Sequence, residues 1–343
     1  MRFQPELFSD DTKYAFAVGK IKVLETKLLS RAELQRMMEA PSAREALSVL
    51  MESPYEEFLS TIESPLQFEE ALNAELERTY RMIDRLSQDK GLTDIFRVRW
   101  DYHNLKVLLK AFYMGSEAEK HALVPLGLVE MDLIRAAMGE EGRVDLLPDY
   151  LGETLLEAQN EYEESQDPQM IDVTVERRAF EDMLKRAQEY PNRFLAGYLR
   201  ASIDLLNIRN LVRIKFLQSS ARLLEKVLVE GGLIPKSRYF RMLDESIAEI
   251  PSLLRGTPYS DVIGPGVQDL VDTGSLATFE RLMDEYLIDY IRPAKYVAFG
   301  IEPLIAYLIA KEHEVKLIRI IMIGKINGLP MELIGERLRE PYV

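Results

Sequence analysis

Two segments far apart in the chain carry polar side chains at matching positions: WDYHNLKVLLKAFYM at 100–114 and IDLLNIRNLVRIKFL at 203–217. Asp101 aligns with Asp204, and Asn104 aligns with Asn207. A third segment, KEHEVKLIRIIMIG at 311–324, places Glu314 at the asparagine position. Carboxylates and amides at such positions can hydrogen-bond a neighbouring helix or recognise the surface of a partner.

Two interpretations of these polar positions remain open. In the first, they are half-buried hydrogen-bonding residues that tie each helix to its neighbour, because a buried carboxylate or amide must be paired. In the second, they line a shared opening and contact a partner. We prefer the first interpretation for the whole set: Asp101, Asn104, Asp204, Asn207, Glu312 and Glu314.

The same three segments also repeat basic side chains, although the chain as a whole is acidic. These cations could form a basic lining where equivalent helices converge, or they could simply be the wet side of amphipathic helices. They are the candidate partner-binding residues: Lys106, Lys110, Arg209, Arg213, Lys316 and Arg319.

The sequence lacks the motifs that carry nucleotide or metal chemistry. GKINGLP and VGKIK lack the residues of a phosphate-binding loop, GPGVQD lacks the third glycine of a dinucleotide fold, and HEVKL lacks the second histidine of a zinc protease. The histidines His103, His121 and His313 lack partner ligands, which favours surface or helix-packing roles over metal binding. No pair of carboxylates stands out for acid–base catalysis. We therefore expect no enzyme activity, metal or cofactor.

Composition narrows the choice of partners. The 343 residues have a formal net charge of −14, which argues against nucleic acid or an anionic membrane surface as the main partner. There is no cysteine, which favours an intracellular setting. The start of the sequence, MRFQPELFSDDTKYAF, has no apolar signal core, and charged residues interrupt the apolar stretches at 303–310 and 315–324. No membrane-spanning helix is expected.

The elements that must carry these residues are helices. Apolar residues recur at helical spacing, as in Leu105, Leu108, Leu109 and Phe112, and Ser30 with Glu33 has the spacing of a capping box. No Asn-Gly hairpin lies between alternating runs, so the sequence predicts an all-α fold. The stretch from 315 to 323 is apolar almost all round, which indicates a helix that is buried on several sides or covered by another protein.

The repeated segments predict three related helical domains. Residues 30–59 also parallel residues 235–263, with Arg36 over Arg241 and Tyr55 over Tyr259. So long a period exceeds that of a solenoid and indicates duplicated small domains, arranged as an open array or a pseudo-threefold ring. The expected domains are 1–116, 117–220 and 221–343, the last with a closing helix over 302–343.

The first part of the chain, YAFAVGKIKVLETKLLSRAELQRMMEAPSAREALSVLMESPYEEFL, and its last part, FGIEPLIAYLIAKEHEVKLIRIIMIGKINGLPMELIGERLREPYV, resemble a known family. They are similar to the C subunit of the archaeal and bacterial V-type (A-type) ATP synthase/ATPase, a relative of the d subunit of the eukaryotic V-ATPase. The resemblance implies a funnel of three helical domains around a central cavity.

The resemblance also implies a function, which is that of a non-catalytic rotor component. Such a protein sits on the membrane proteolipid ring at the cytoplasmic face as one copy per complex, and its cavity receives the D and F subunits of the central stalk. It would couple ATP hydrolysis or synthesis to transport of hydrogen or other ions, with no small-molecule substrate and no nucleic acid. From the residues alone, a soluble helical scaffold and a hydrolase that uses acidic residues stay open as alternatives.

Overall fold

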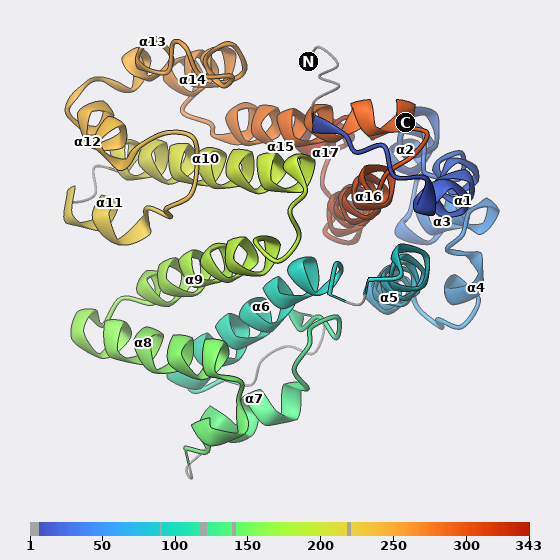
Figure 1. Ribbon diagram of the computed structural model, residues 1–343, viewed down its shortest axis with the longest axis horizontal. Helices are drawn as coiled ribbons and strands as arrows, with labels where there is room; N and C mark the ends of the chain where they lie inside the picture. The colour runs from blue at the N-terminus through green and yellow to red at the C-terminus, as the bar shows by residue number, and fades with distance from the viewer. Residues whose placement is uncertain (1–6, 90, 117–121, 139–141, 218–220) are drawn as a thin grey trace. The chain divides into compact units, whose positions relative to one another are not determined.

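The computed structural model describes residues 7–89, 91–116, 122–138, 142–217 and 221–343. Over these residues the chain forms α-helices, short 3-10 helices and turns, without a strand (Figure 1). The prediction of an all-α fold is confirmed. None of the described helices is long and apolar enough to cross a membrane.

The chain divides into two compact units. Unit 1 comprises Met1–Asp89, Asn192–Tyr198 and Asp244–Val343, and unit 2 comprises Lys90–Pro191 and Leu199–Leu243. The division into three domains expected from the repeats stays a prediction.

Unit 1 contains most of the short helices and the longest one. Its α-helices are α1 (Ala15–Glu25), α2 (Arg31–Glu39), α3 (Ala43–Ser48), α4 (Glu56–Leu59), α5 (Phe68–Ser87), α13 (Ile250–Leu253), α14 (Ser260–Thr273), α15 (Ala277–Ile291), α16 (Glu302–Ile326) and α17 (Met331–Arg337). The 3-10 helix η8 (Arg292–Tyr296) joins α15 to the segment before α16.

Helix α16 forms the core of unit 1. The helices α1, α2, α3, α5 and α17 pack around it, as the view in Figure 1 shows for α1, α2 and α5. Its apolar residues Val315, Ile318 and Ile321 join one hydrophobic cluster with residues of α2, α3 and α5. The expectation that this stretch is buried on several sides is confirmed.

Local sequence signals set the ends of the elements in unit 1. Ser30 and Glu33 form the expected capping box at the start of α2, with the Ser30 N–H donating to Glu33 Oε2 at 2.7 Å. At the end of α16, Gly328 has a φ of 66°. The Leu329 N–H donates to the Gly324 carbonyl at 2.9 Å, which closes a Schellman turn before Pro330. The segment 302–343 therefore contains two helices, α16 and α17, where the sequence suggested one.

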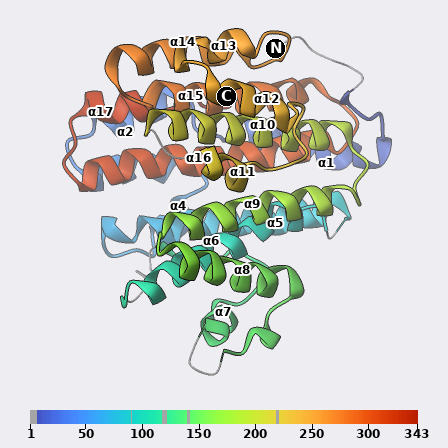
Figure 2. The ribbon, with the colours of Figure 1, turned by 90° about the vertical axis from the view of Figure 1, so that its left-hand side faces the viewer.

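Unit 2 is built around the long helices α6 and α9, which pack against each other. Its helices are α6 (Asp94–Tyr113), α7 (Met131–Met138), α8 (Asp149–Ser165), α9 (Gln169–Ala187), α11 (Ala221–Val227), α12 (Lys236–Asp244) and most of α10 (Arg193–Phe216), which begins in unit 1. Helix α9 packs against α6 and α8, and Figure 2 shows the three running alongside one another. The repeated segments of the sequence are thus α6, α10 and α16.

Candidate partner-binding site

The repeated asparagines of α6 and α10 bind the chain segment that follows each helix. Asn104 Nδ2 donates to the Val124 carbonyl at 2.8 Å, and the Val124 N–H donates to Asn104 Oδ1 at 2.8 Å. Asn207 makes the same two bonds with Val229, at 2.8 and 2.9 Å. Each buried amide thereby satisfies both backbone groups of one valine.

The repeated aspartates, one turn earlier, bind the same two segments. Asp101 Oδ1 accepts the N–H groups of Leu128 and Val129 at 2.8 and 2.9 Å, and the Tyr150 hydroxyl donates to Oδ2 at 2.9 Å. Asp204 accepts from three equivalent donors at 2.8, 3.1 and 3.1 Å, namely Leu233, Ile234 and Tyr239. We call the polar side chains of each repeated helix, with the segment they hold, a latch.

A glycine lies against the aspartate in each of these latches. A Cβ added at Gly127 would come within 2.1 Å of Asp101 Oδ1, and a Cβ at Gly232 would come within 2.1 Å of Asp204 Oδ1. The missing side chain is therefore what lets the loop backbone approach the carboxylate.

Helix α16 carries a latch of different chemistry. Lys311 stands at the aspartate position and Glu314 at the asparagine position, and they pair at 2.6 Å between Nζ and Oε1. Glu314 accepts the Leu29 N–H through Oε2 and the Tyr55 hydroxyl through Oε1, the latter at 2.9 Å. Lys311 also lies 3.5 Å from Glu75 Oε1 and is fully buried.

The α16 latch also differs in where its held segment lies in the sequence. The helices α6 and α10 hold segments that follow them, whereas α16 holds Leu29 and Tyr55, near the start of the chain. Residues 30–59 parallel 235–263 in sequence, which places Leu29 at the position of Ile234 and Lys27 at that of Gly232. The α16 latch thus has a lysine where the other two have an aspartate, and no glycine opposite it.

Burial and charge set the ionisation of these groups. Burial raises the pKa of Asp101 to about 6, against the opposing effect of its hydrogen bonds from Val129, Tyr150 and Leu128. Burial alone would lower the pKa of Lys311, but Glu314 and other neighbours raise it above its ordinary value. Burial raises the pKa of Glu75, partly offset by Lys311 and Arg78. The α16 latch therefore holds a charged lysine between two carboxyl groups.

The structural interpretation of the repeated polar positions is confirmed, with deeper burial than the half-burial expected. Five of the six are buried hydrogen-bonding groups: Asp101, Asn104, Asp204, Asn207 and Glu314. The sixth, Glu312, is half-buried and accepts the Tyr80 hydroxyl from α5.

The six candidate cations lie on the outer flanks of the same helices, and most of them already pair with a carboxylate of a packed helix. On α6, Lys106 and Lys110 lie 3.9 and 2.8 Å from the two oxygens of Asp172. On α10, Arg209 pairs with Glu176 at 2.8 Å. Arg213, one turn further along α10, is exposed. These pairs tie α6 and α10 to α9.

The cations of α16 are held in the same way. Lys316 pairs with Asp284 of α15 at 2.6 Å. Arg319 makes two bonds to Glu69 of α5, at 2.7 and 2.8 Å. A role for the six cations in binding a partner stays a prediction.

Two of the three histidines fill matching structural roles. The ring Nε2 of His103 lies 2.9 Å from the Ala122 carbonyl, and that of His313 lies 2.9 Å from the Glu340 carbonyl. Burial lowers the pKa of His313 to about 4, so this ring is neutral and donates its N–H to the carbonyl. His121 lies outside the described residues. Among those that are described, no group of three histidine, aspartate or glutamate side chains is placed to hold a metal ion.

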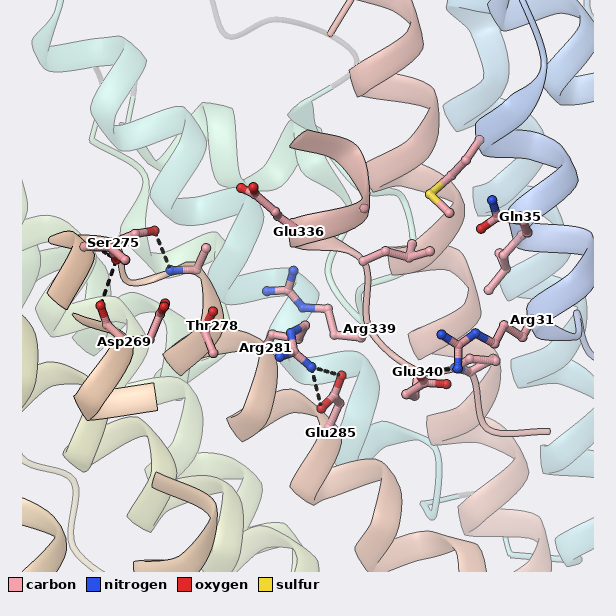
Figure 3. Close-up of a pocket in the computed structure, with 17 residues that line it drawn as sticks. Arg31, Gln35, Asp269, Ser275, Thr278, Arg281, Glu285, Glu336, Arg339 and Glu340 are labelled. Atoms are coloured by element: carbon pink, nitrogen blue, oxygen red, sulfur yellow. Dashed lines mark hydrogen bonds and ion pairs between the residues drawn. The ribbon is translucent and has the colours of Figure 1, made fainter. Parts of the chain in front are cut away.

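A pocket of about 650 Å³ opens in unit 1 between residues of α2, α14, α15 and α17 (Figure 3). Its three arginines are all engaged. Arg31 pairs with Glu340 at 3.0 Å, Arg281 with Glu285 at 2.9 Å, and Arg339 with Asp284 at 2.8 Å. The pocket therefore presents compensated charge, without the concentrated positive potential that an anionic ligand would require.

Sequence reasoning missed the partners of the latches. The loops that bind Asp101 and Asp204 read VPLGLV at 124–129 and VEGGLI at 229–234, and their shared valine, glycine and leucine could have identified them. The repeat aligns Tyr55 with Tyr259, but nothing near Tyr55 or Glu75 in the sequence shows that they complete the α16 latch, because both come from elements distant from α16 in the chain.

Comparison with known proteins places the chain in a family. The family model described as ATP synthase (C/AC39) subunit matches residues 17–337. The chain is 28% identical over 322 residues to the C subunit of the V-type sodium ATPase of Enterococcus hirae, covering 94% of this chain and 97% of that protein. It is 25% identical to the C subunit of the A-type ATP synthase of Methanocaldococcus jannaschii, with 96% and 87% covered, and 27% identical to that of Haloferax volcanii, with 94% and 96% covered.

The match of the family model runs from α1 to the end of α17 and so includes all three latches. The chain belongs to the ATP synthase (C/AC39) subunit family.

Proposed function

We propose that the chain is a non-catalytic rotor component of a V-type or A-type ATPase. In this role it sits at the cytoplasmic face of the membrane and couples the D and F subunits of the central stalk to the proteolipid ring. Torque passing through it links ATP hydrolysis or synthesis to ion transport. The observation that carries the proposal is the family match over residues 17–337, together with relatives that are the C subunits of such enzymes.

The latches suit an element that transmits torque. A helix that carries load must not slide or rotate against its neighbours, and buried hydrogen bonds resist both motions because breaking them leaves unsatisfied polar groups. Each of α6, α10 and α16 is held by such groups on its buried side. On its outer flank, each carries an ion pair to a packed helix.

The first test of the proposal is assembly. The purified chain is mixed with the detergent-solubilised proteolipid ring, with the D–F stalk pair, and with both, and each mixture is separated by size-exclusion chromatography. We expect the chain to co-elute with each partner alone and to bridge the two when both are present. A chain that elutes alone in all three mixtures would contradict the proposal and favour a scaffold unrelated to a rotary enzyme.

The candidate cations can be tested in the same assay. Arg213→Glu reverses the charge of an exposed cation. We propose that Arg213 contacts the stalk and that Arg213→Glu weakens co-elution with the D–F pair. Arg44→Glu, at an exposed position on α3, is the control and should have no effect.

A further inference from the structure

The segment 338–343 follows α17 and runs across α2, α15, α16, η8 and the end of α1 without forming a helix, and we call it the strap. Three of its successive carbonyl groups each accept a hydrogen bond from a side chain of α16 or η8. The donors and the residues whose carbonyls accept, at 2.9, 2.7 and 2.6 Å, are His313 with Glu340, Arg292 with Pro341, and Lys295 with Tyr342. The middle of the strap is therefore held by the side chains of other elements.

Tyr342 anchors the strap at the end of α1. Its side chain is 3% exposed, and its hydroxyl donates to Glu25 Oε1 at 3.0 Å. The ammonium group of Lys295 lies 4.2 Å from the centre of its ring. Of the six residues of the strap, Tyr342 and Pro341 are the two that are buried. The burial of these two side chains therefore decides whether the strap is closed.

The strap covers one side of the α16 latch. A cavity of about 10 Å³ lies between the two, and its lining includes Glu314 and Leu29 of the latch and Pro341 and Tyr342 of the strap. This volume has room for one water molecule at most, so the closed strap keeps bulk solvent away from the latch. A hydrogen bond to a charged group is stronger where water is excluded, so removal of the strap should weaken the bond from the Leu29 N–H to Glu314.

The strap and the latch fasten the same connection, residues 26–30, which joins α1 to α2. The connection begins after Glu25, which accepts the Tyr342 hydroxyl, and it contains Leu29, whose N–H binds Glu314. The side chains of Leu28 and Leu29 are buried beneath the strap. Loss of either fastening leaves this short connection held at one end only.

We propose that the strap is a lock on the α16 latch. It opens locally when Tyr342 withdraws from its site beside Glu25, and its opening releases the connection 26–30 from Glu314. The helices beneath keep their own backbone hydrogen bonds when the strap leaves, so opening requires no unfolding of α15 or α16. Unit 1 therefore has two states, one with the connection fastened and one with it released. The lock goes beyond the proposed function and does not depend on it.

Hydrogen exchange of the full-length chain, followed by mass spectrometry of its peptides, measures the release of the connection. We expect Tyr342→Ala to speed exchange in 26–30 at least about tenfold, while exchange in 315–321, in the core of α16, changes by less than about twofold. Phe16→Ala removes an aromatic side chain that is 80% exposed on α1, and this matched control should change neither segment.

A milder variant keeps the test decisive if the alanine chain does not fold. Tyr342→Phe retains the ring and loses only the hydrogen bond to Glu25, so it should speed exchange in 26–30 by a smaller factor of about three. The proposal is wrong if the variants that fold leave exchange in 26–30 unchanged. It is also wrong if exchange in 315–321 rises by the same factor, because the strap is then part of the common core.

The reverse experiment tests the coupling between lock and latch. Glu314→Gln keeps the size of the side chain but weakens its bonds to Lys311 and Leu29. Because coupling acts equally in both directions, this variant should open the strap and raise the rate at which hydroxyl radicals oxidise Tyr342. Glu69→Gln, which weakens the pair with Arg319 elsewhere on α16, is the control and should leave that rate unchanged. If Tyr342 stays as protected in Glu314→Gln as in the natural chain, the strap does not lock the latch.

Discussion

The latches of unit 2 and the latch of unit 1 hold equivalent helices by different means. In unit 2, Asp101 accepts hydrogen bonds from a loop, and Asn104 both donates to it and accepts from it. A glycine lies where this loop comes closest to Asp101. In unit 1, Lys311 and Glu314 form a buried ion pair, and Glu314 alone accepts the backbone N–H of the held segment.

The difference shows how one latch can be converted into the other. A lysine at the aspartate position cannot accept an N–H, so the acceptor moves one turn along the helix to Glu314. Glu314 then lies close enough to neutralise the lysine. With no carboxylate at the aspartate position, the glycine is no longer needed, and Lys27 occupies its position.

The largest expected effect is the removal of the buried cation. Lys311→Met leaves Glu314 buried without its counter-charge and leaves Glu75 with Arg78 alone, which should cost about 3–5 kcal/mol of unfolding free energy. The loss of unfolding free energy is measured by urea unfolding monitored with far-UV circular dichroism. Lys110→Met removes a partly exposed pair with Asp172 and is the control, with an expected loss below about 1 kcal/mol.

The location of the loss can also be measured. The chain has one tryptophan, Trp100, which lies in α6 and reports on unit 2. Lys311→Met should lower the circular-dichroism midpoint more than the Trp100 fluorescence midpoint. If Lys311→Met and Lys110→Met lower the unfolding free energy equally, the buried ion pair stabilises the protein no more than the partly exposed one.

Acid should change the contributions of His313 in unit 1 and of Asp101 in unit 2 in opposite directions. The pKa of His313 is lowered from 6.5 to about 4, so its contribution to the stability of unit 1 is lost as the pH falls through that range, by about 3 kcal/mol in total. The pKa of Asp101 is raised from 3.8 to about 6, so ionisation of Asp101 weakens unit 2 as the pH rises from about 4 to 6, by a similar amount.

Two variants separate these contributions in urea unfolding at pH 4 and pH 7. Asp101→Asn cannot ionise, so it should gain stability relative to the natural chain at pH 7 and lose that advantage at pH 4, as seen by Trp100 fluorescence. His313→Gln should make the circular-dichroism transition less sensitive to acid. An Asp101→Asn effect that is the same at both pH values would contradict the assigned pKa.

The amide of a unit 2 latch should matter less than the buried lysine. Asn104→Ala leaves the N–H and carbonyl of buried Val124 without partners, which should cost about 2–3 kcal/mol. Trp100 fluorescence during urea unfolding measures it. Asn210→Ala, on the less buried side of α10, is the control. If both substitutions lower the unfolding free energy by the same amount, Asn104 stabilises the protein no more than an ordinary helix position does.

The smallest expected effect concerns the glycine. Gly127→Ala would place a Cβ against the Asp101 carboxylate and should cost about 1–3 kcal/mol by forcing the loop away. Lys27→Ala, at the equivalent position of the α16 latch, should change the unfolding free energy by less than about 0.5 kcal/mol. If the Gly127→Ala chain is as stable as the natural one, the loop can accommodate a Cβ next to Asp101, which contradicts the close contact described here.

The sequence predicts the helices, but it does not predict most of the side-chain contacts between them. The all-α fold, the repeated helices and the buried role of Asn104 and Asn207 follow from apolar periodicity and from the need to pair buried amides. The α16 latch was recognised only through Glu314, because Lys311 looks like a solvated charge unless Glu75 and Tyr55 are known to surround it. The candidate cations look available for a partner in the sequence, but the structure pairs most of them. Their carboxylate partners, such as Asp172 and Asp284, lie on other helices and cannot be identified from the sequence.

Coupling is the central claim, and ion transport per ATP tests it most directly. The complete rotary enzyme is reconstituted in vesicles with and without the chain, and ATP hydrolysis is measured alongside uptake of sodium and of protons. We predict that vesicles without the chain hydrolyse ATP but transport neither ion, and that adding the chain restores transport. Equal transport per ATP with and without the chain would contradict its role in coupling.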